Sequence, residues 1–317
     1  MDFANALHPF HLDDFIRTHW AQRPLWIGGD ESKFSDLYDF SDLRAGLMGD
    51  VTPGRGRRAP LGVKVGYNDG EAQGHIGMVP MQEAMSLFDA GMSLCITRVD
   101  AASPKLAELV ASVRKQMQFK GEVEINCYYS PDHAGFSWHF DCQHVFILQI
   151  DGKKRWEYTP YTGIDWPPFN VTPKLARSPE GQSMTQALGV EIRLPEKEEV
   201  QSQVLSPGDV LYLPPGTWHR ASADGHSMAL TLTLYPLSPV RLLRTLLTVM
   251  AVREVSWRRD IQACGLLQHE DRMASCLDGF LQSVKACLDQ TSGEALLGLH
   301  SNPRLYQLAA IVDSRLM

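Results

Sequence analysis

Residues 135–158 read G-F-S-W-H-F-D-C-Q-H-V-F-I-L-Q-I-D-G-K-K-R-W-E-Y, and this stretch decides the fold. Short runs of apolar and β-branched residues indicate strands, and the pair Asp151-Gly152 is typical of a tight turn between antiparallel strands, so we predict a hairpin there. Successive side chains of a strand point to opposite faces. His139 and Asp141 therefore point the same way, and Phe140 between them points away.

A second histidine occurs in L-P-P-G-T-W-H-R, residues 213–220. A Pro-Gly turn precedes the short apolar strand Val210–Leu213, and a Pro-Pro-Gly turn follows it, so His219 is held at the end of a rigid hairpin. Two histidines and one carboxylate are typical of non-haem Fe(II) oxygenases, because about three of six octahedral positions remain open. We predict that His139, Asp141 and His219 bind a catalytic metal ion; the ordinary alternative for His219 is a solvated turn residue.

Composition excludes several classes of protein. The 317 residues, 44 % of them hydrophobic, suit one large domain or a main and an accessory domain. The formal charge of −7 argues against binding of a nucleic-acid backbone. No run approaches the roughly 18 apolar residues of a membrane span, and the N-terminus lacks the pattern of a secretory signal. We therefore expect a cytoplasmic protein, whose six cysteines without a C-x-x-C pair are reduced.

The chain changes character twice. Helical periodicity precedes about residue 121, and Ser103 and Pro104 stand where a helix would begin. Short strands broken by turns then follow, and helical sequence returns after Pro239. We predict a mainly β protein with flanking helices, a double-stranded β-helix (jelly-roll or cupin barrel) plus a C-terminal helical region. The expected segments are helices at 34–50 and 80–92, a basic loop at 54–58, an insertion at 161–203 that becomes a lid or a substrate groove, and domains 1–239 and 240–317.

The C-terminal region of about 75 residues is too short and too leucine-rich to fold comfortably alone. We expect it to pack either on the barrel or on a second subunit, and both alternatives stay open.

Lys154 gives the sharpest physical clue. After the Asp-Gly turn, Lys153, Arg155 and Glu157 share one face of the returning strand, so Lys154 shares the other with Trp156 and points inward. A buried ammonium is costly without an anionic partner, and the neighbouring strands offer none. A dicarboxylate such as 2-oxoglutarate would supply that partner while it chelates iron. The alternatives are a lysine that reaches the barrel rim, or a register shifted by one.

The stretch 135–158 and the later L-S-P-G-D-V-L-Y-L-P-P-G-T-W-H closely resemble the JmjC-type cupin oxygenases, in particular the ribosomal-oxygenase branch that hydroxylates protein side chains. The resemblance covers about residues 8–237 and includes F-I-R-T-H-W-A-Q-R-P-L-W-I and L-F-D-A-G upstream. It implies that His139, Asp141 and His219 bind Fe(II) and that Lys154 binds the distal carboxylate of 2-oxoglutarate. As a looser match, Asn126 and Thr233 fall where the family places polar groups near this co-substrate.

These observations favour an Fe(II)- and 2-oxoglutarate-dependent hydroxylase that uses O2 to oxidise a C–H bond of a protein or peptide side chain. The family's ribosomal enzymes continue into a helical dimerisation region and a winged-helix module, for which this chain leaves too little length. A free amino acid or another metabolite is therefore an alternative substrate. A non-oxidative metal-binding cupin and a zinc hydrolase are the alternative classes of protein.

Overall fold

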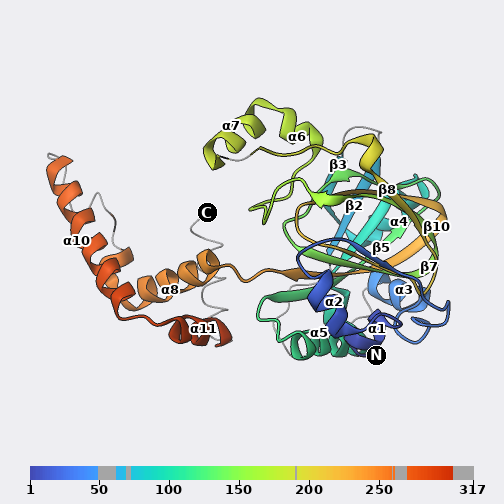
Figure 1. The fold of residues 1–317 in the computed structure, drawn as a ribbon, viewed down its shortest axis with the longest axis horizontal. Helices are drawn as coiled ribbons and strands as arrows, with labels where there is room; N and C mark the ends of the chain where they lie inside the picture. The colour runs from blue at the N-terminus through green and yellow to red at the C-terminus, as the bar shows by residue number, and fades with distance from the viewer. Residues whose placement is uncertain (49–61, 69–72, 190, 259, 261–269, 303–317) are drawn as a thin grey trace. The chain divides into compact units, whose positions relative to one another are not determined.

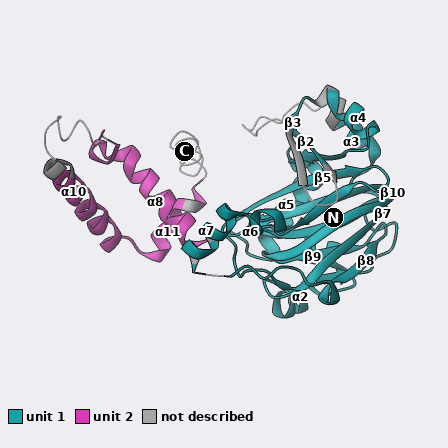
Figure 2. Cartoon of the chain, turned by 90° about the horizontal axis from the view of Figure 1, so that it is seen from above, with its two compact units in different colours: residues 1–236 teal, residues 237–317 magenta. Residues whose placement is uncertain are grey.

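The computed structural model describes residues 1–48, 62–68, 73–189, 191–258, 260 and 270–302. The predicted basic loop at 54–58 lies outside these ranges. The chain divides into two compact units, Met1–Pro236 and Leu237–Met317, which Figure 2 shows in different colours. None of the helices in the described part of the chain combines the length and apolar character that a membrane span requires.

Strands of the first unit form one antiparallel sheet that curls around an interior (Figure 1). Among the described residues the order of hydrogen-bonded neighbours is β1-β9-β7-β10-β5-β4-β2-β3, with β6 paired to β10 and β8 paired to β7. The strands are β1 Leu25–Ile27, β2 Gly62–Asn68, β3 Gln73–Val79, β4 Ser93–Thr97, β5 Glu122–Ser130, β6 Gly135–His139, β7 His144–Thr162, β8 Gln201–Leu205, β9 Val210–Leu213 and β10 Thr217–Tyr235.

The predicted hairpin at Asp151-Gly152 is wrong, because β7 runs through this pair as one bent strand of 19 residues. β10 is equally long and pairs with β7 from Thr217↔Thr162 to Leu234↔His144. Gly152 has a φ of +65° and supplies a bend instead of a turn, and the register of the two strands shifts close by. The long bent strands thus build both halves of the jelly roll.

Successive side chains of each strand point to opposite faces of the sheet, so the two faces carry different residues. On β10, Leu230, Leu232 and Leu234 point outward into the main hydrophobic core, whereas Thr231 and Thr233 line an interior cavity. Phe3 and other residues of the N-terminal helices complete this outer core, for example through an edge-on contact of Phe3 with Phe146 at 5.2 Å. The main core therefore lies under the helices. The interior combines the polar lining of the cavity with a second, smaller apolar cluster that includes Val145, Ile147 and Leu211.

The helices that flank the sheet in sequence are mostly where periodicity predicts them. Ser103 caps α5 by accepting from the Leu106 N–H, and Pro104 opens that helix. The predicted helix at 34–50 is shorter, and the insertion contains two helices that its composition did not predict. The helices of this unit are α1 Phe3–Leu7, α2 Leu12–Thr18, α3 Phe40–Met48, α4 Met81–Asp89, α5 Pro104–Gln116, α6 Pro173–Arg177 and α7 Pro179–Leu188.

The second unit is helical in its described part, as expected, with α8 Pro239–Arg253, α10 Glu270–Asp289 and α11 Gly293–Ser301. The predicted boundary after residue 239 falls just beyond the division at Pro236. The cysteines in the described ranges form no disulfide, and burial raises the pKa of the Cys95 thiol to about 11. Cys95 and Cys127 are buried, whereas Cys142, Cys276 and Cys287 are partly buried.

Candidate metal centre

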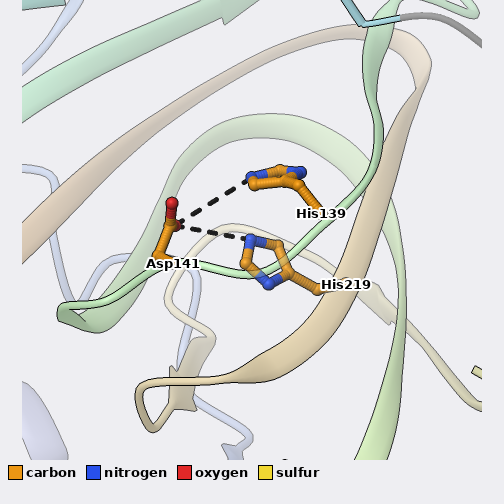
Figure 3. A group of neighbouring side chains, drawn as sticks. All are labelled: His139, Asp141 and His219. Atoms are coloured by element: carbon orange, nitrogen blue, oxygen red, sulfur yellow. Dashed lines mark ion pairs between the residues drawn. The ribbon is translucent and has the colours of Figure 1, made fainter. Parts of the chain in front are cut away.

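Three donor side chains converge inside the barrel (Figure 3). His139, Asp141 and His219 each offer one ligand atom, and these atoms lie within 4.8 Å of one another. The Asp141 Oδ2 is 4.0 Å from the His139 Nε2 and 3.7 Å from the His219 Nε2. Donors at neighbouring octahedral positions with bonds of about 2.1 Å lie about 3 Å apart. An ion therefore fits after each histidine nitrogen approaches the Asp141 oxygen by about 1 Å or less and the two histidine nitrogens approach each other by less than about 2 Å.

Strand pairing brings the two histidines together. His139 ends β6, and His219 lies opposite it near the start of β10, so both rings emerge on the same face. Their centroids are 4.2 Å apart. His219 is therefore a strand residue and not the end of a turn.

Backbone hydrogen bonds set the tautomer of both imidazoles. The Nδ1–H of His139 donates to the Ser137 carbonyl at 2.8 Å, and that of His219 donates to the Thr217 carbonyl at 2.9 Å. A carbonyl can only accept, so each Nδ1 carries the proton and each Nε2 presents its lone pair to the centre. This second hydrogen bond is typical of metal-binding histidines.

Burial keeps His219 neutral. Desolvation, assisted by the neighbouring His139, lowers the pKa of His219 to about 4. The side chains of His139 and Asp141 keep 16 % and 20 % of their exposure, against 4 % for His219. The centre is thus closed on the His219 side and accessible from the other.

Asp141 is placed by tertiary contacts and not by the strand that was predicted to carry it. β6 ends at His139, and Phe140 forms an isolated antiparallel bridge with Val171. The backbone stays extended through Phe140, so the side-chain parity of His139 and Asp141 still holds. The Gly216 N–H donates a hydrogen bond to the Asp141 carbonyl at 2.8 Å. The Asn170 Nδ2 donates a second hydrogen bond to the Asp141 Oδ1 at 2.7 Å.

A cavity of about 400 Å³ opens beside the metal ligands. Asn126 and Thr233 line it together with His139 and Asp141, so the structure brings these predicted residues to one site. The remaining lining residues include Lys64, Thr97, Glu124, Tyr128, Phe136, Gln143, Asn170, Thr172, Thr231 and Tyr235. The wall is therefore rich in hydrogen-bonding groups.

Lys154 is buried, with 1 % of its surface exposed, as the parity argument predicts. Its ammonium donates to the Ser130 hydroxyl at 2.9 Å, and no carboxylate within the described ranges pairs with it. Desolvation lowers its pKa to about 8. Lys154 does not line the cavity, but Phe136 does, and the Lys154 Nζ lies 5.7 Å from the centre of the Phe136 ring. The charge therefore sits beside the cavity wall and not inside the cavity.

Asn126 already has protein partners at both ends of its amide. Its Oδ1 accepts from the Arg98 N–H at 2.8 Å, and its Nδ2 donates to the Glu124 Oε1 at 3.3 Å. The Tyr235 hydroxyl donates to the same Glu124 oxygen at 2.8 Å. One amide hydrogen of Asn126 remains for a ligand, so its main visible role is to organise this end of the cavity.

Three aromatic residues lie near the ligands in the sequence or on the neighbouring strand, Tyr128, Trp138 and Trp218, and of these Tyr128 lines the cavity. Trp218 is fully buried on the opposite side of β10, where it packs against Phe140 at 4.7 Å. The guanidinium of Arg220 lies over the Trp138 ring at 5.2 Å. Sequence reasoning missed Ser130 and Asn170, and only alternation along β5 could have indicated Ser130 as an inward residue.

This geometry defines a class: a cupin barrel with two histidines and one carboxylate at an open, cavity-lined metal centre. Residues 104–239 match the JmjC domain family. The chain therefore carries a JmjC domain.

Curated relatives support this assignment. The chain is 32 % identical to ribosomal oxygenase 1 of Rattus norvegicus over 74 % of its own length and 36 % of the relative's. It is 27 % identical to a bifunctional lysine-specific demethylase and histidyl-hydroxylase NO66 of Aedes aegypti, over 74 % of this chain and 34 % of that one. The chain thus spans about a third of the length of these relatives.

Solved structures share the fold. A structure of YcfD, a ribosomal oxygenase from Escherichia coli, in complex with cobalt and 2-oxoglutarate superposes with a TM-score of 0.58 at 17 % identity. The match covers 94 % of this chain and 69 % of that one. At this identity the likeness establishes the architecture alone.

Proposed function

We propose that this chain is an Fe(II)- and 2-oxoglutarate-dependent hydroxylase that acts on a side chain of a protein or peptide. The observation that carries the proposal is the donor set itself. Two Nε2 lone pairs and one carboxylate oxygen face a common point, and the ligand set leaves open positions beside a polar cavity. Relatives named ribosomal oxygenase and histidyl-hydroxylase support a protein substrate.

The residues present fit both groups that the reaction requires. His139, Asp141 and His219 would hold Fe(II), which supplies activation of O2 for C–H oxidation when 2-oxoglutarate is also bound. Lys154 and Ser130 would hold the distal carboxylate, because a buried ammonium beside a hydroxyl lacks only an anion. Phe136, whose ring lies next to the ammonium, must let that carboxylate pass.

The other residues of the site work as binding and orienting groups. The two Nδ1–H bonds keep the imidazoles turned toward the metal before it arrives, so little reorganisation accompanies binding. Glu124, held by Tyr235 and Asn126, presents a carboxylate to the cavity that a hydrogen-bond donor on the substrate would meet. Asn170, Thr172 and Leu175 of the insertion line the same cavity and so help to shape the space that a substrate would enter.

The test is oxygen-dependent formation of succinate from 2-oxoglutarate by Fe(II)-loaded protein, with peptides that contain histidine as the first candidate substrates. We expect succinate together with a mass increase of one oxygen atom on the peptide. His139→Ala should abolish both, whereas His226→Ala should not, because His226 is an exposed residue paired with Asp151.

Failure to form succinate with any peptide or metabolite, although the metal is bound, would instead indicate a non-oxidative cupin. Stable Zn(II) binding with hydrolytic turnover would indicate a hydrolase. Hydroxylation of a free amino acid only would leave the reaction class intact and replace the proposed substrate.

A further inference from the structure

We infer that Asn170 is a positioning residue that makes Asp141 a one-oxygen metal ligand. Asn170 lies in the 161–203 insertion, 29 residues after Asp141, and neither motif of the metal site includes it. The inference rests on the proposed function, because it concerns how the same centre holds its ion. It assigns the insertion a direct role in the metal site.

The orientation of the Asn170 amide follows from its two partners. The backbone N–H of Cys142 can only donate, and it donates to the Asn170 Oδ1 at 2.8 Å. The Asp141 carboxylate can only accept, and its Oδ1 accepts from the Asn170 Nδ2 at 2.7 Å. An amide turned the other way would lose both bonds, so the assignment of its O and N atoms is determined.

This contact gives the two Asp141 carboxylate oxygens different partners. Oδ1 is occupied by the amide, and Oδ2 is the oxygen that faces the Nε2 atoms of His139 and His219. A carboxylate free on both sides can bind an ion through both oxygens. The Asn170 amide opposes this mode and thereby preserves a coordination position for the co-substrate or O2.

The insertion is fastened to the strands that carry the ligands, so the amide is held in place. Phe140 and Val171 exchange two backbone hydrogen bonds, of 3.0 Å and 3.1 Å. Their side chains form a buried cluster with Trp218, the residue before His219. The Trp218 Nε1–H also donates to the Arg193 carbonyl at 2.6 Å, in the second half of the insertion. Asn170 thus stands on a segment that contacts both metal-binding strands.

The experiment is an anaerobic titration of metal-free protein with Co(II), followed by calorimetry and by the absorption spectrum of the bound ion. We expect Asn170→Ala to bind Co(II) about 10- to 100-fold more weakly, which is the usual effect of removing a group that orients a metal ligand. We also expect a changed spectrum, because Asp141 gains the freedom to bind through both oxygens. Catalytic turnover does not enter this measurement.

Val171→Ala is the matched control, because it loosens the same segment without touching the amide. We expect its loss of Co(II) affinity to stay below the roughly 10-fold lower limit for a group that orients a metal ligand. Equal affinity and an equal spectrum for wild type and Asn170→Ala would overturn the inference and leave the proposed function standing. Equal loss in both variants would overturn it too, since packing alone would then explain the effect. A wild-type protein that binds no Co(II), Mn(II) or Fe(II) would overturn the proposed function, and this inference with it.

Discussion

Replacing Lys154 by methionine tests the co-substrate site most directly. Methionine fills a similar volume, and it removes the charge together with the hydrogen bond that the ammonium donates to Ser130. The structure lowers the pKa of Lys154 from 10.5 to about 8 by desolvation, which corresponds to a penalty of about 3 kcal/mol on the charged form in the folded protein. Without ligand, Lys154→Met should therefore be more stable than the wild type, by up to that amount at pH 7.

The sign of the pH dependence follows from the lowered pKa. Below pH about 8 the buried ammonium is charged and the penalty is fully present; it declines as the pH rises toward the unfolded value of 10.5. The stability advantage of Lys154→Met, measured by urea unfolding of metal-free protein, should therefore shrink between pH 8 and pH 10.

Binding of 2-oxoglutarate should change in the opposite direction. Loss of one partner from a buried charge pair costs about 2 to 4 kcal/mol, so Lys154→Met should weaken 2-oxoglutarate binding to the Mn(II)-loaded protein by about 30- to 1000-fold. For the wild type, affinity should fall about tenfold for each pH unit above about 8, because the neutral amine must first take up a proton. Anaerobic calorimetry measures both effects.

Two results would refute this reasoning. Unchanged affinity for 2-oxoglutarate in Lys154→Met would show that the ammonium does not contact the co-substrate. A stability difference independent of pH would show that the buried amine is not charged at neutral pH.

Three other substitutions or treatments have defined outcomes. Gly152→Ala should lower the free energy of unfolding by at least about 2 kcal/mol. Gly152 has a φ of +65°, and an added Cβ would lie 1.9 Å from the His226 carbonyl oxygen. An unchanged urea-unfolding curve would contradict the bend that β7 makes at Gly152. Trp218→Phe should cost about 1 to 3 kcal/mol through lost volume and the lost bond to Arg193, again by urea unfolding. Mn(II) at about 100 times its Kd should stabilise the protein by about 2.7 kcal/mol; EDTA should reverse this, and equal stabilisation of Asp141→Ala would argue against the site.

Sequence periodicity was sufficient for much of the site. The alternation along Phe136–Asp141 placed His139 and Asp141 on one side, and the alternation along 153–158 placed Lys154 inward; both survive in the structure although one strand ends early and the predicted hairpin is absent. The reason is local: side-chain parity depends only on an extended backbone, whether the chain turns back or continues.

The pairing of the long strands and the neighbours of the site residues could be found only from the tertiary structure. A glycine with positive φ serves a turn or a bend equally well, so only the pairing of β7 with β10 decides that Gly152 lies within one long strand. Likewise, no local pattern connects Asn170 with Asp141 or Ser130 with Lys154, because these contacts join residues 29 and 24 positions apart through the packing of the insertion and the curl of the sheet. The sequence by itself determined which donor side chains and which lysine point toward the candidate site. The tertiary structure decided which neighbours orient them, because orientation arises from contacts between segments that no local periodicity encodes.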